Sequence, residues 1–179
     1  KESFLGFEYS KKIFEPDGFY LTPITKETQY SLYGFHKRHL KKIDVELLTS
    51  FRLSDLQIKP GEYVFDSGNR NLFLKDDAGE LILDESGNPI SLVKDRNFKN
   101  FSLSFGVEKN IGQFKLNSWF MHTMRAPKVE ELFSDGPHLA AYSFEIGNPD
   151  LKSEEIYGIE NSISYTSNSF NFSLVNFYN

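Results

Sequence analysis

Residues 119–155, WFMHTMRAPKVEELFSDGPHLAAYSFEIGNPDLKSEE, decide how the rest of the chain is interpreted. The segment begins in one alternating strand and leads into another. Between them, Val129, Leu132 and Phe133 fall on one face of a short helical turn. We expect Pro127 at the first position of that turn, where its missing N–H costs nothing. The segment therefore predicts an ordered connection between two strands.

The second half of this connection predicts a polar loop that contains His138 and then a tight turn. Gly147 supplies freedom in φ, and Asn148-Pro149 is typical of turn initiation. Taken alone, these features describe an ordered loop and no particular activity.

Outside this connection, apolar residues recur at every second position. The clearest alternation runs from Ile43 to Leu53, and a period of two over that length predicts a half-buried strand. The same pattern predicts strands at Gly6–Phe14, Thr28–His39, Ile43–Leu53, Phe98–Val107, Gln113–His122 and Ile156–Tyr165, and one that starts at Phe170.

The connections between these strands alternate in length. They are medium at about 15–27, short at 40–42, long at 55–97, short at 109–112, long at 123–153 and short at 167–169. A transmembrane β-barrel is wired in this way, with short periplasmic turns and long extracellular loops. A soluble sandwich has no reason to place every long loop at one end. The predicted fold class is therefore all-β, an antiparallel meander forming part of a transmembrane β-barrel.

The long polar connection at 55–97 contains its own hairpin signal. Leu72-Phe73-Leu74 and Leu81-Ile82-Leu83 flank the turn sequence Asp76-Asp77-Ala78-Gly79. The acidic residues here lack the spacing of a calcium-binding loop, so no calcium site is predicted.

Composition and motifs exclude several classes. The 179 residues include 20 Lys and Arg against 25 Asp and Glu, a net charge of −5, which argues against a nucleic-acid groove. There is no cysteine, so disulfide scaffolds and thiolate metal sites are excluded. No run approaches the roughly 18 apolar residues of a membrane helix, a requirement that β-barrels escape. Hydrolase, zinc-protease and nucleotide-binding motifs are missing, and we expect no enzyme activity.

A family resemblance becomes specific in the 119–155 segment. The residues that carry it are Met124-Arg125-Ala126-Pro127, Glu131-Leu132-Phe133, Gly136-Pro137-His138, Phe144-Glu145, Gly147-Asn148-Pro149-Asp150-Leu151 and Glu154. Their order resembles the paired "RAP…NP-L" signature of TonB-dependent outer-membrane receptors. In the haem-uptake branch of that family, the signature brackets a histidine that helps to hold the ligand. Zinc and iron-chelate receptors share versions of it.

The resemblance implies an integral outer-membrane barrel of a bacterium. The function would be binding a scarce metal complex (haem, zinc or a ferric siderophore) and passing it inward, with energy from the TonB complex acting through the plug. No intrinsic cofactor is implied, and outer-membrane lipid would surround the barrel. Such barrels have about 22 strands. Residues 1–179 would then be a fragment of one barrel domain, without the plug domain and the C-terminal strands.

The resemblance also implies ligand-binding residues: Arg125, His138, Tyr142 and Asn148. Neutral imidazole is the commonest biological metal donor, so His138 is the leading candidate. Asp135 and Glu145 are oxygen donors nearby that could complete a metal site. Arg125 could pair with a ligand carboxylate, or it could instead tie the loop to neighbouring glutamates.

The other histidines are weaker candidates. His122 lies at the extracellular end of a strand and could be a second metal ligand, but its alternation parity is that of the lipid-facing residues. His36 and His39 lie next to a periplasmic turn, the wrong end for capture. The alternative function is a soluble all-β module that binds a ligand or glycan.

Overall fold

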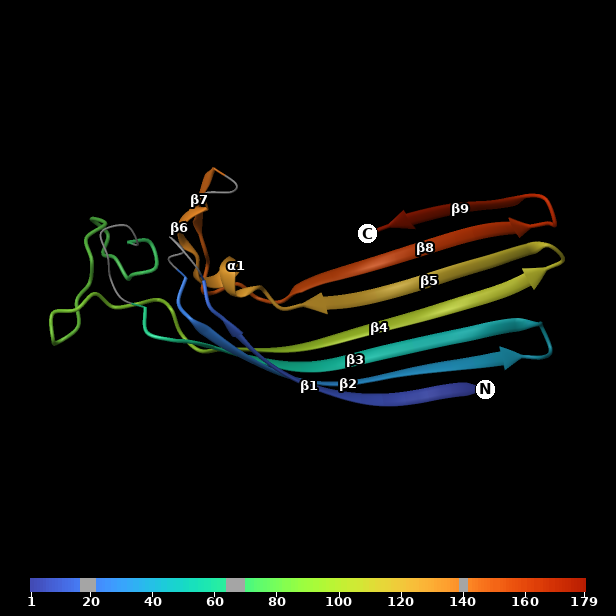
Figure 1. The fold of residues 1–179 in the computed structure, drawn as a ribbon, viewed down its shortest axis with the longest axis horizontal. Coiled ribbons are helices and arrows are strands. Elements are labelled where there is room, and N and C mark those ends of the chain that lie inside the picture. Colours follow the sequence, from blue (N-terminus) through green and yellow to red (C-terminus); the bar gives the residue numbers. More distant parts are fainter. Residues whose placement is uncertain (17–21, 64–69, 139–141) are drawn as a thin grey trace.

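Seven antiparallel strands lie side by side in the order β1-β2-β3-β4-β5-β8-β9 (Figure 1). The computed structural model describes residues 1–16, 22–63, 70–138 and 142–179. The strands of the sheet are β1 (Glu2–Phe14), β2 (Thr25–Leu40), β3 (Val45–Pro60), β4 (Arg96–Ile111), β5 (Phe114–Arg125), β8 (Glu154–Thr166) and β9 (Asn171–Tyr178). The predicted all-β antiparallel meander is confirmed. Among the described residues, no helix is both long and apolar enough to cross a membrane.

The two faces of the sheet differ in chemistry, as the alternation predicts. On the polar face, Ser50 and Ser104 join their hydroxyls at 2.7 Å, and Arg52 donates to the Glu8 carboxylate at 2.7 Å. On the apolar face, Leu53 pairs with Phe101 across the strands, and both are about two-fifths exposed. Such a continuous exposed apolar face needs a covering, since soluble proteins rarely expose large apolar patches.

The apolar band has the height of a membrane crossing. On β4, the residues of the apolar face run from Phe101 to Ile111, interrupted only by Lys109. A tilted strand needs about 9–11 residues to cross the hydrocarbon layer. We call the polar face the lumen face from here on, since barrel interiors are polar.

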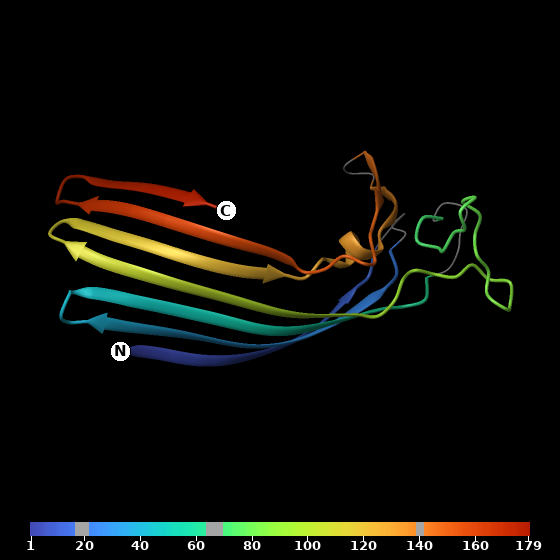
Figure 2. The same cartoon turned by 180° about the vertical axis from the view of Figure 1, so that it is seen from behind.

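The short turns lie at one end of the sheet and the long connections at the other (Figures 1 and 2). At the short end, Asp44 and Gly112 adopt positive φ values of 53° and 59°, which compact turns require. The predicted alternation of short and long connections is confirmed.

The strands extend further than predicted, most of all β3, which continues to Pro60. The predicted connection at 55–97 therefore shortens to 61–95. The cause is a change of phase in the apolar pattern. Leu53 faces the apolar side, whereas Leu56 and Ile58 share the parity of Ser54 and point to the lumen side. Beyond Leu53 the strand lies outside the membrane, and its apolar side chains are on the lumen face.

These lumen-facing residues are covered by a cap built from the connections. Helix α1 (Val129–Phe133) buries one face against the sheet, and the hairpin of β6 (Asp135–His138) and β7 (Ser143–Ile146) follows it. The cap core consists of Ile58, Leu72, Phe98, Val129, Leu132 and Phe133. The predicted helical turn is confirmed, but its start is Lys128 as N-cap, so Pro127 precedes the helix and the prediction of Pro127 at its first position was wrong.

The connection at 70–95 forms a small ladder of its own. The predicted hairpin is present, with the Ile82 amide donating to the Leu74 carbonyl at 2.9 Å, and a third segment pairs through Ile90 with Ile82 at 3.0 Å. Asp76 and Asp84 each cap two backbone amides in the turns between segments.

Candidate functional site

The cap stands over the lumen face at the end with the long connections. Its buried helix face packs on Ile58 and Phe98, and both residues have lumen-face parity. A ligand entering from that end would meet the cap before the barrel interior. The candidate site residues must therefore be judged by where they lie in the cap.

Arg125 lies at the end of β5 and holds the cap to the sheet. Its guanidinium donates to the Glu131 carboxylate twice, at 3.0 and 3.2 Å, and to the Glu154 carboxylate at 3.0 Å. Glu131 also accepts a hydrogen bond from the Lys128 amide at 2.7 Å. Arg125 above all, and the Lys128 amide, lower the pKa of the Glu131 carboxyl. Of the two roles open from the sequence, this geometry matches the structural clamp.

Asn148 completes the same attachment from the other end of the connection. Its amide donates to the Glu131 carbonyl at 2.9 Å, and its side-chain oxygen accepts the Asp150 amide at 2.9 Å. Beside it, the Gly147 amide donates to the Ser134 carbonyl at 2.6 Å. A Cβ at Gly147 would lie 2.6 Å from the Leu132 carbonyl carbon, so the backbone approach requires glycine.

Asp135 is fully buried and works as an internal anchor. Its carboxylate accepts hydrogen bonds from the Asn71 amide at 2.8 Å and the Asn71 side chain at 2.6 Å. The Tyr63 hydroxyl and the Leu72 amide donate at 3.2 and 3.3 Å. These contacts join the 70–95 connection to the hairpin, and they occupy the oxygens that the sequence suggested for a metal.

His138 lies in strand β6, not in the polar loop that was expected, and it pairs with Glu145 of β7. The His138 Nδ1 and the Glu145 carboxylate are 2.5 Å apart, and both side chains are about a third or more exposed. A carboxylate on one ring nitrogen fixes the orientation of a histidine, as in many metal sites. The two residues were suggested together from the sequence, and in the hairpin they are diagonal neighbours on one face, since His138 lies opposite Ser143 and Glu145 opposite Gly136.

This pair borders a groove of about 470 Å³ between the cap and the end of β1. The groove is lined by Phe14, Glu15, Pro16, Lys128, Glu130, Glu131, His138 and Glu145. Its carboxylates outnumber its cations, and Arg125 already neutralises Glu131. The groove is therefore suited to a positively charged ligand. Sequence reasoning missed Glu15, which lies just after β1 and reaches the hairpin only through the fold, and it missed Lys128, the N-cap of α1.

The remaining candidates lie apart from the groove. Tyr142 is 99% exposed at the hairpin end, with a positive φ of 51°. His122 is on the apolar face, 4.7 Å between ring centroids from Tyr157, so its predicted lipid-side parity is confirmed. Among the described residues, no three His, Asp or Glu side chains converge as a metal site would require. Asp135 and His122 thus do not join His138 and Glu145.

The geometry defines a class of protein. Amphipathic strands of membrane-crossing length, with short turns at one end and an ordered cap over the lumen face at the other, form the wall of a transmembrane β-barrel.

The family model described as TonB dependent receptor-like, beta-barrel matches residues 2–179, and the chain belongs to this family. A search of solved structures found no match. The family places the chain in the bacterial outer membrane as part of an integral β-barrel, with a transport function rather than catalysis. It also implies coupling to TonB and import of a small molecule. Membership removes the soluble-module alternative.

Proposed function

We propose that this receptor imports a scarce metal complex and that His138 and Glu145 make its first contact with the metal. The observation that carries this proposal is the His138–Glu145 pair on the border of the 470 Å³ groove at the outer end of the lumen. Glu145 orients the ring through Nδ1, and the imidazole of His138 would be the donor to the metal.

The charge of the groove favours a zinc species over haem and ferric siderophores. Glu15, Glu130 and Glu145 face the groove against Lys128. A haem ligand carries two propionates and needs cationic partners, and Arg125 is already held by two glutamates. Haem and a ferric siderophore are the alternatives to zinc. If the ligand is haem, His138 would be its axial donor.

The test uses the full-length receptor purified in detergent. Zinc binding is measured by calorimetry, haemin binding by visible absorption, and ferric-siderophore binding by fluorescence quenching. Each is repeated with the His138→Ala and Glu145→Gln variants. The matched control is His36→Ala, because His36 lies near the opposite end of the sheet, where its ring is 2.7 Å from the Ser3 hydroxyl.

The zinc proposal predicts binding that weakens by about tenfold or more in both groove variants and is unchanged in the control. A haemin Soret band that only the His138→Ala variant loses would replace zinc by haem. Binding of all three ligands that is indifferent to both groove substitutions would refute the role of this pair. Family membership would stand in each case.

A further inference from the structure

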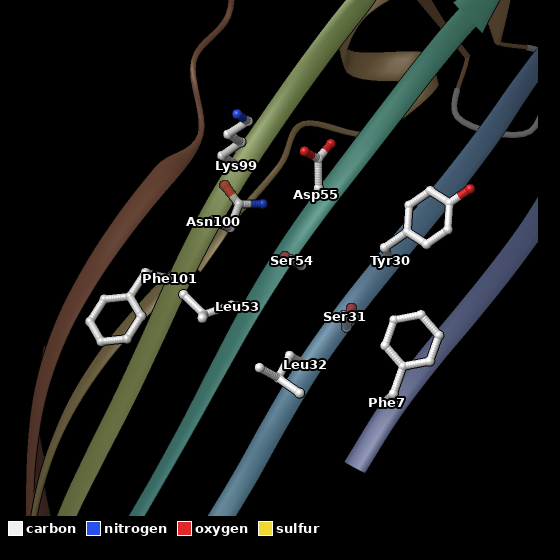
Figure 3. Close-up of a pocket in the computed structure, with 10 residues that line it drawn as sticks. All are labelled: Phe7, Tyr30, Ser31, Leu32, Leu53, Ser54, Asp55, Lys99, Asn100 and Phe101. Atoms are coloured by element: carbon white, nitrogen blue, oxygen red, sulfur yellow. The ribbon is translucent and has the colours of Figure 1, made fainter. Parts of the chain in front are cut away.

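The apolar face of the sheet is the lipid-facing one, since the family places the chain in the outer membrane as part of a barrel. Figure 3 shows Phe7, Leu32, Leu53 and Phe101 of this face in a row across β1, β2, β3 and β4. All four side chains are between 39% and 67% exposed. Lipid tails are an adequate covering for such a row, because its side chains require no hydrogen bonds.

Strand β8 carries a polar side chain on this face in the middle of the membrane. Its lipid-facing residues are Tyr157, Ile159, Asn161, Ile163 and Tyr165. Tyrosines mark both ends of this series, as the aromatic girdles of barrels do at the two surfaces of the membrane. The segment between them has the length that a tilted strand needs to cross the hydrocarbon layer, about 9–11 residues. Asn161 lies midway along it.

Asn161 belongs to a polar row that crosses neighbouring strands. Ser118 of β5 and Asn176 of β9 are its direct cross-strand neighbours, and these side chains are exposed. The rows on either side are apolar or aromatic. The row toward the long connections contains Phe120, Ile159 and Tyr178, and the row toward the short turns contains Leu116, Ile163 and Leu174.

Much of the hydrogen-bonding capacity of this polar row is unused. The Ser118 hydroxyl donates to Asn161 Oδ1 at 2.8 Å, but within the described part of the chain the Asn161 amide hydrogens and the Asn176 side chain have no partner. In the next row of the same face, by contrast, the Ser3 hydroxyl and the His36 ring bind each other at 2.7 Å. Since β8 lies between β5 and β9, no further strand of the same barrel can come to lie next to Asn161. An amide without partners is costly in hydrocarbon, so lipid tails are a poor covering for this row.

We propose that this face of β5, β8 and β9 is an interface between two copies of the receptor within the membrane, joined through Asn161. A carboxamide both donates and accepts, so two asparagines that face each other across a twofold axis are complementary. The row carries no charge, so the two copies do not repel each other. Asparagine is one of the side chains that join protein segments in membranes, and the exposed Ile159 and Leu174 pack around the amides.

The experiment is photo-crosslinking of the full-length receptor in native outer membranes. A benzophenone amino acid replaces Ile159, which lies on the same face as Asn161 in the next row, and it captures whatever covers this face. Two copies with different affinity tags are expressed together, so a product of two receptors carries both tags. The matched position for the crosslinker is Thr49, which lies in the row of Ile159 but on β3.

We expect a crosslinked product with both tags from position 159 and none from position 49. Combining Asn161→Leu with Asn176→Leu should lower the yield of this product about tenfold, because hydrogen bonds are lost from both copies. The matched control is Asn117→Leu, the same change on the lumen face, and it should leave the yield unchanged. Heat-modifiable migration on gels confirms that each variant is a folded barrel.

A product that carries only one tag would mean that a different membrane protein covers this face, and no product from position 159 would mean that lipid covers it. Either result would overturn the proposal. Equal two-tag products from positions 159 and 49 would mean chance contacts in a crowded membrane, and a yield indifferent to both leucine substitutions would exclude the amides. Both would overturn it too. The proposal is independent of the imported ligand, so the metal-binding results have no bearing on it.

Discussion

The carboxylate of Asp135 offers the sharpest test of how the cap is held together. Replacing it by alanine leaves the Asn71 amide, the Asn71 side chain, the Tyr63 hydroxyl and the Leu72 amide without their acceptor. Each hydrogen bond to a charged group contributes about 1.5–3 kcal/mol. Two of the four contacts are longer than 3.1 Å, and water can reach the groups once the segment opens. We therefore expect Asp135→Ala to lower the free energy of local opening by about 4 kcal/mol, most of it from the two short contacts.

The expected result is local opening of the 70–95 connection while the barrel stays folded. A cost of about 4 kcal/mol raises the opening constant nearly a thousandfold. Hydrogen exchange of the Asn71 and Leu72 amides, measured by mass spectrometry on the full-length receptor, reports this directly. Limited trypsin cleavage at Lys75 should accelerate in parallel. Asp135→Asn, which keeps one acceptor oxygen, should have a smaller effect.

The control is Asp76→Ala in the same connection. Asp76 also accepts two backbone amides, from Ala78 and Glu80, but it does so in an exposed turn. This variant should leave exchange at Asn71 unchanged. Unchanged exchange at Asn71 and Leu72 in Asp135→Ala would refute the anchor role, and the packing of Leu72 in the cap core would then have to hold the connection by itself.

Three further changes test the attachment of the cap to the sheet. Arg125→Ala should expose helix α1 to protease. Arg125→Lys should not restore the protection, since a lysine cannot match the forked contacts to Glu131 and Glu154. Full protection in the lysine variant would contradict the clamp. Gly147→Ala should destabilise the cap by about 1–3 kcal/mol through its clash with Leu132, measured as faster α1 amide exchange; unchanged exchange would show that the backbones can separate. Arg125 lowers the pKa of Glu131 in the folded cap. The Arg125–Glu131 interaction therefore stabilises the cap fully above the ordinary glutamate pKa, and this stabilisation declines as pH falls through the lowered value. The amide exchange rate of α1, corrected for the intrinsic effect of pH on exchange, should rise below about pH 4. Glu131→Gln should abolish this rise. A rise that persists in the variant would show that another group titrates.

The strands could be predicted from alternation within the membrane band and not beyond it. From Ile43 to Leu53 the apolar face meets lipid, so the pattern has one phase. Beyond Asp55 the surroundings of the two faces are reversed. The outer face meets water, and the lumen face is covered by the cap, so the apolar Leu56 and Ile58 point to the lumen side. A pattern that changes phase looks like the end of a strand. The sequence therefore predicts a loop from Asp55, whereas the strand continues to Pro60 outside the membrane.

The candidate site was predictable only where its contacts are local. The pairing of Arg125 with Glu131 and Glu154 was one of two alternatives from sequence spacing. His138 and Glu145 meet because a short hairpin makes them diagonal neighbours on one face. The contact of Asp135 with Asn71 joins residues that are 64 positions apart in sequence, and no local pattern marks it. For the same reason the sequence suggested Asp135 only as an oxygen donor that could complete a metal site and gave no sign of its contacts with Asn71.

The two halves of the family signature meet at a single residue, and this explains what the resemblance could and could not predict. The Arg125 side chain binds the Glu131 carboxylate, and the Asn148 amide binds the Glu131 carbonyl. The signature thus closes the connection into a cap and fixes it to the sheet. The groove chemistry comes instead from His138 and Glu145, which the closed cap positions. A motif that specifies the attachment identifies the family, and the ligand must be found from the residues that the attachment presents.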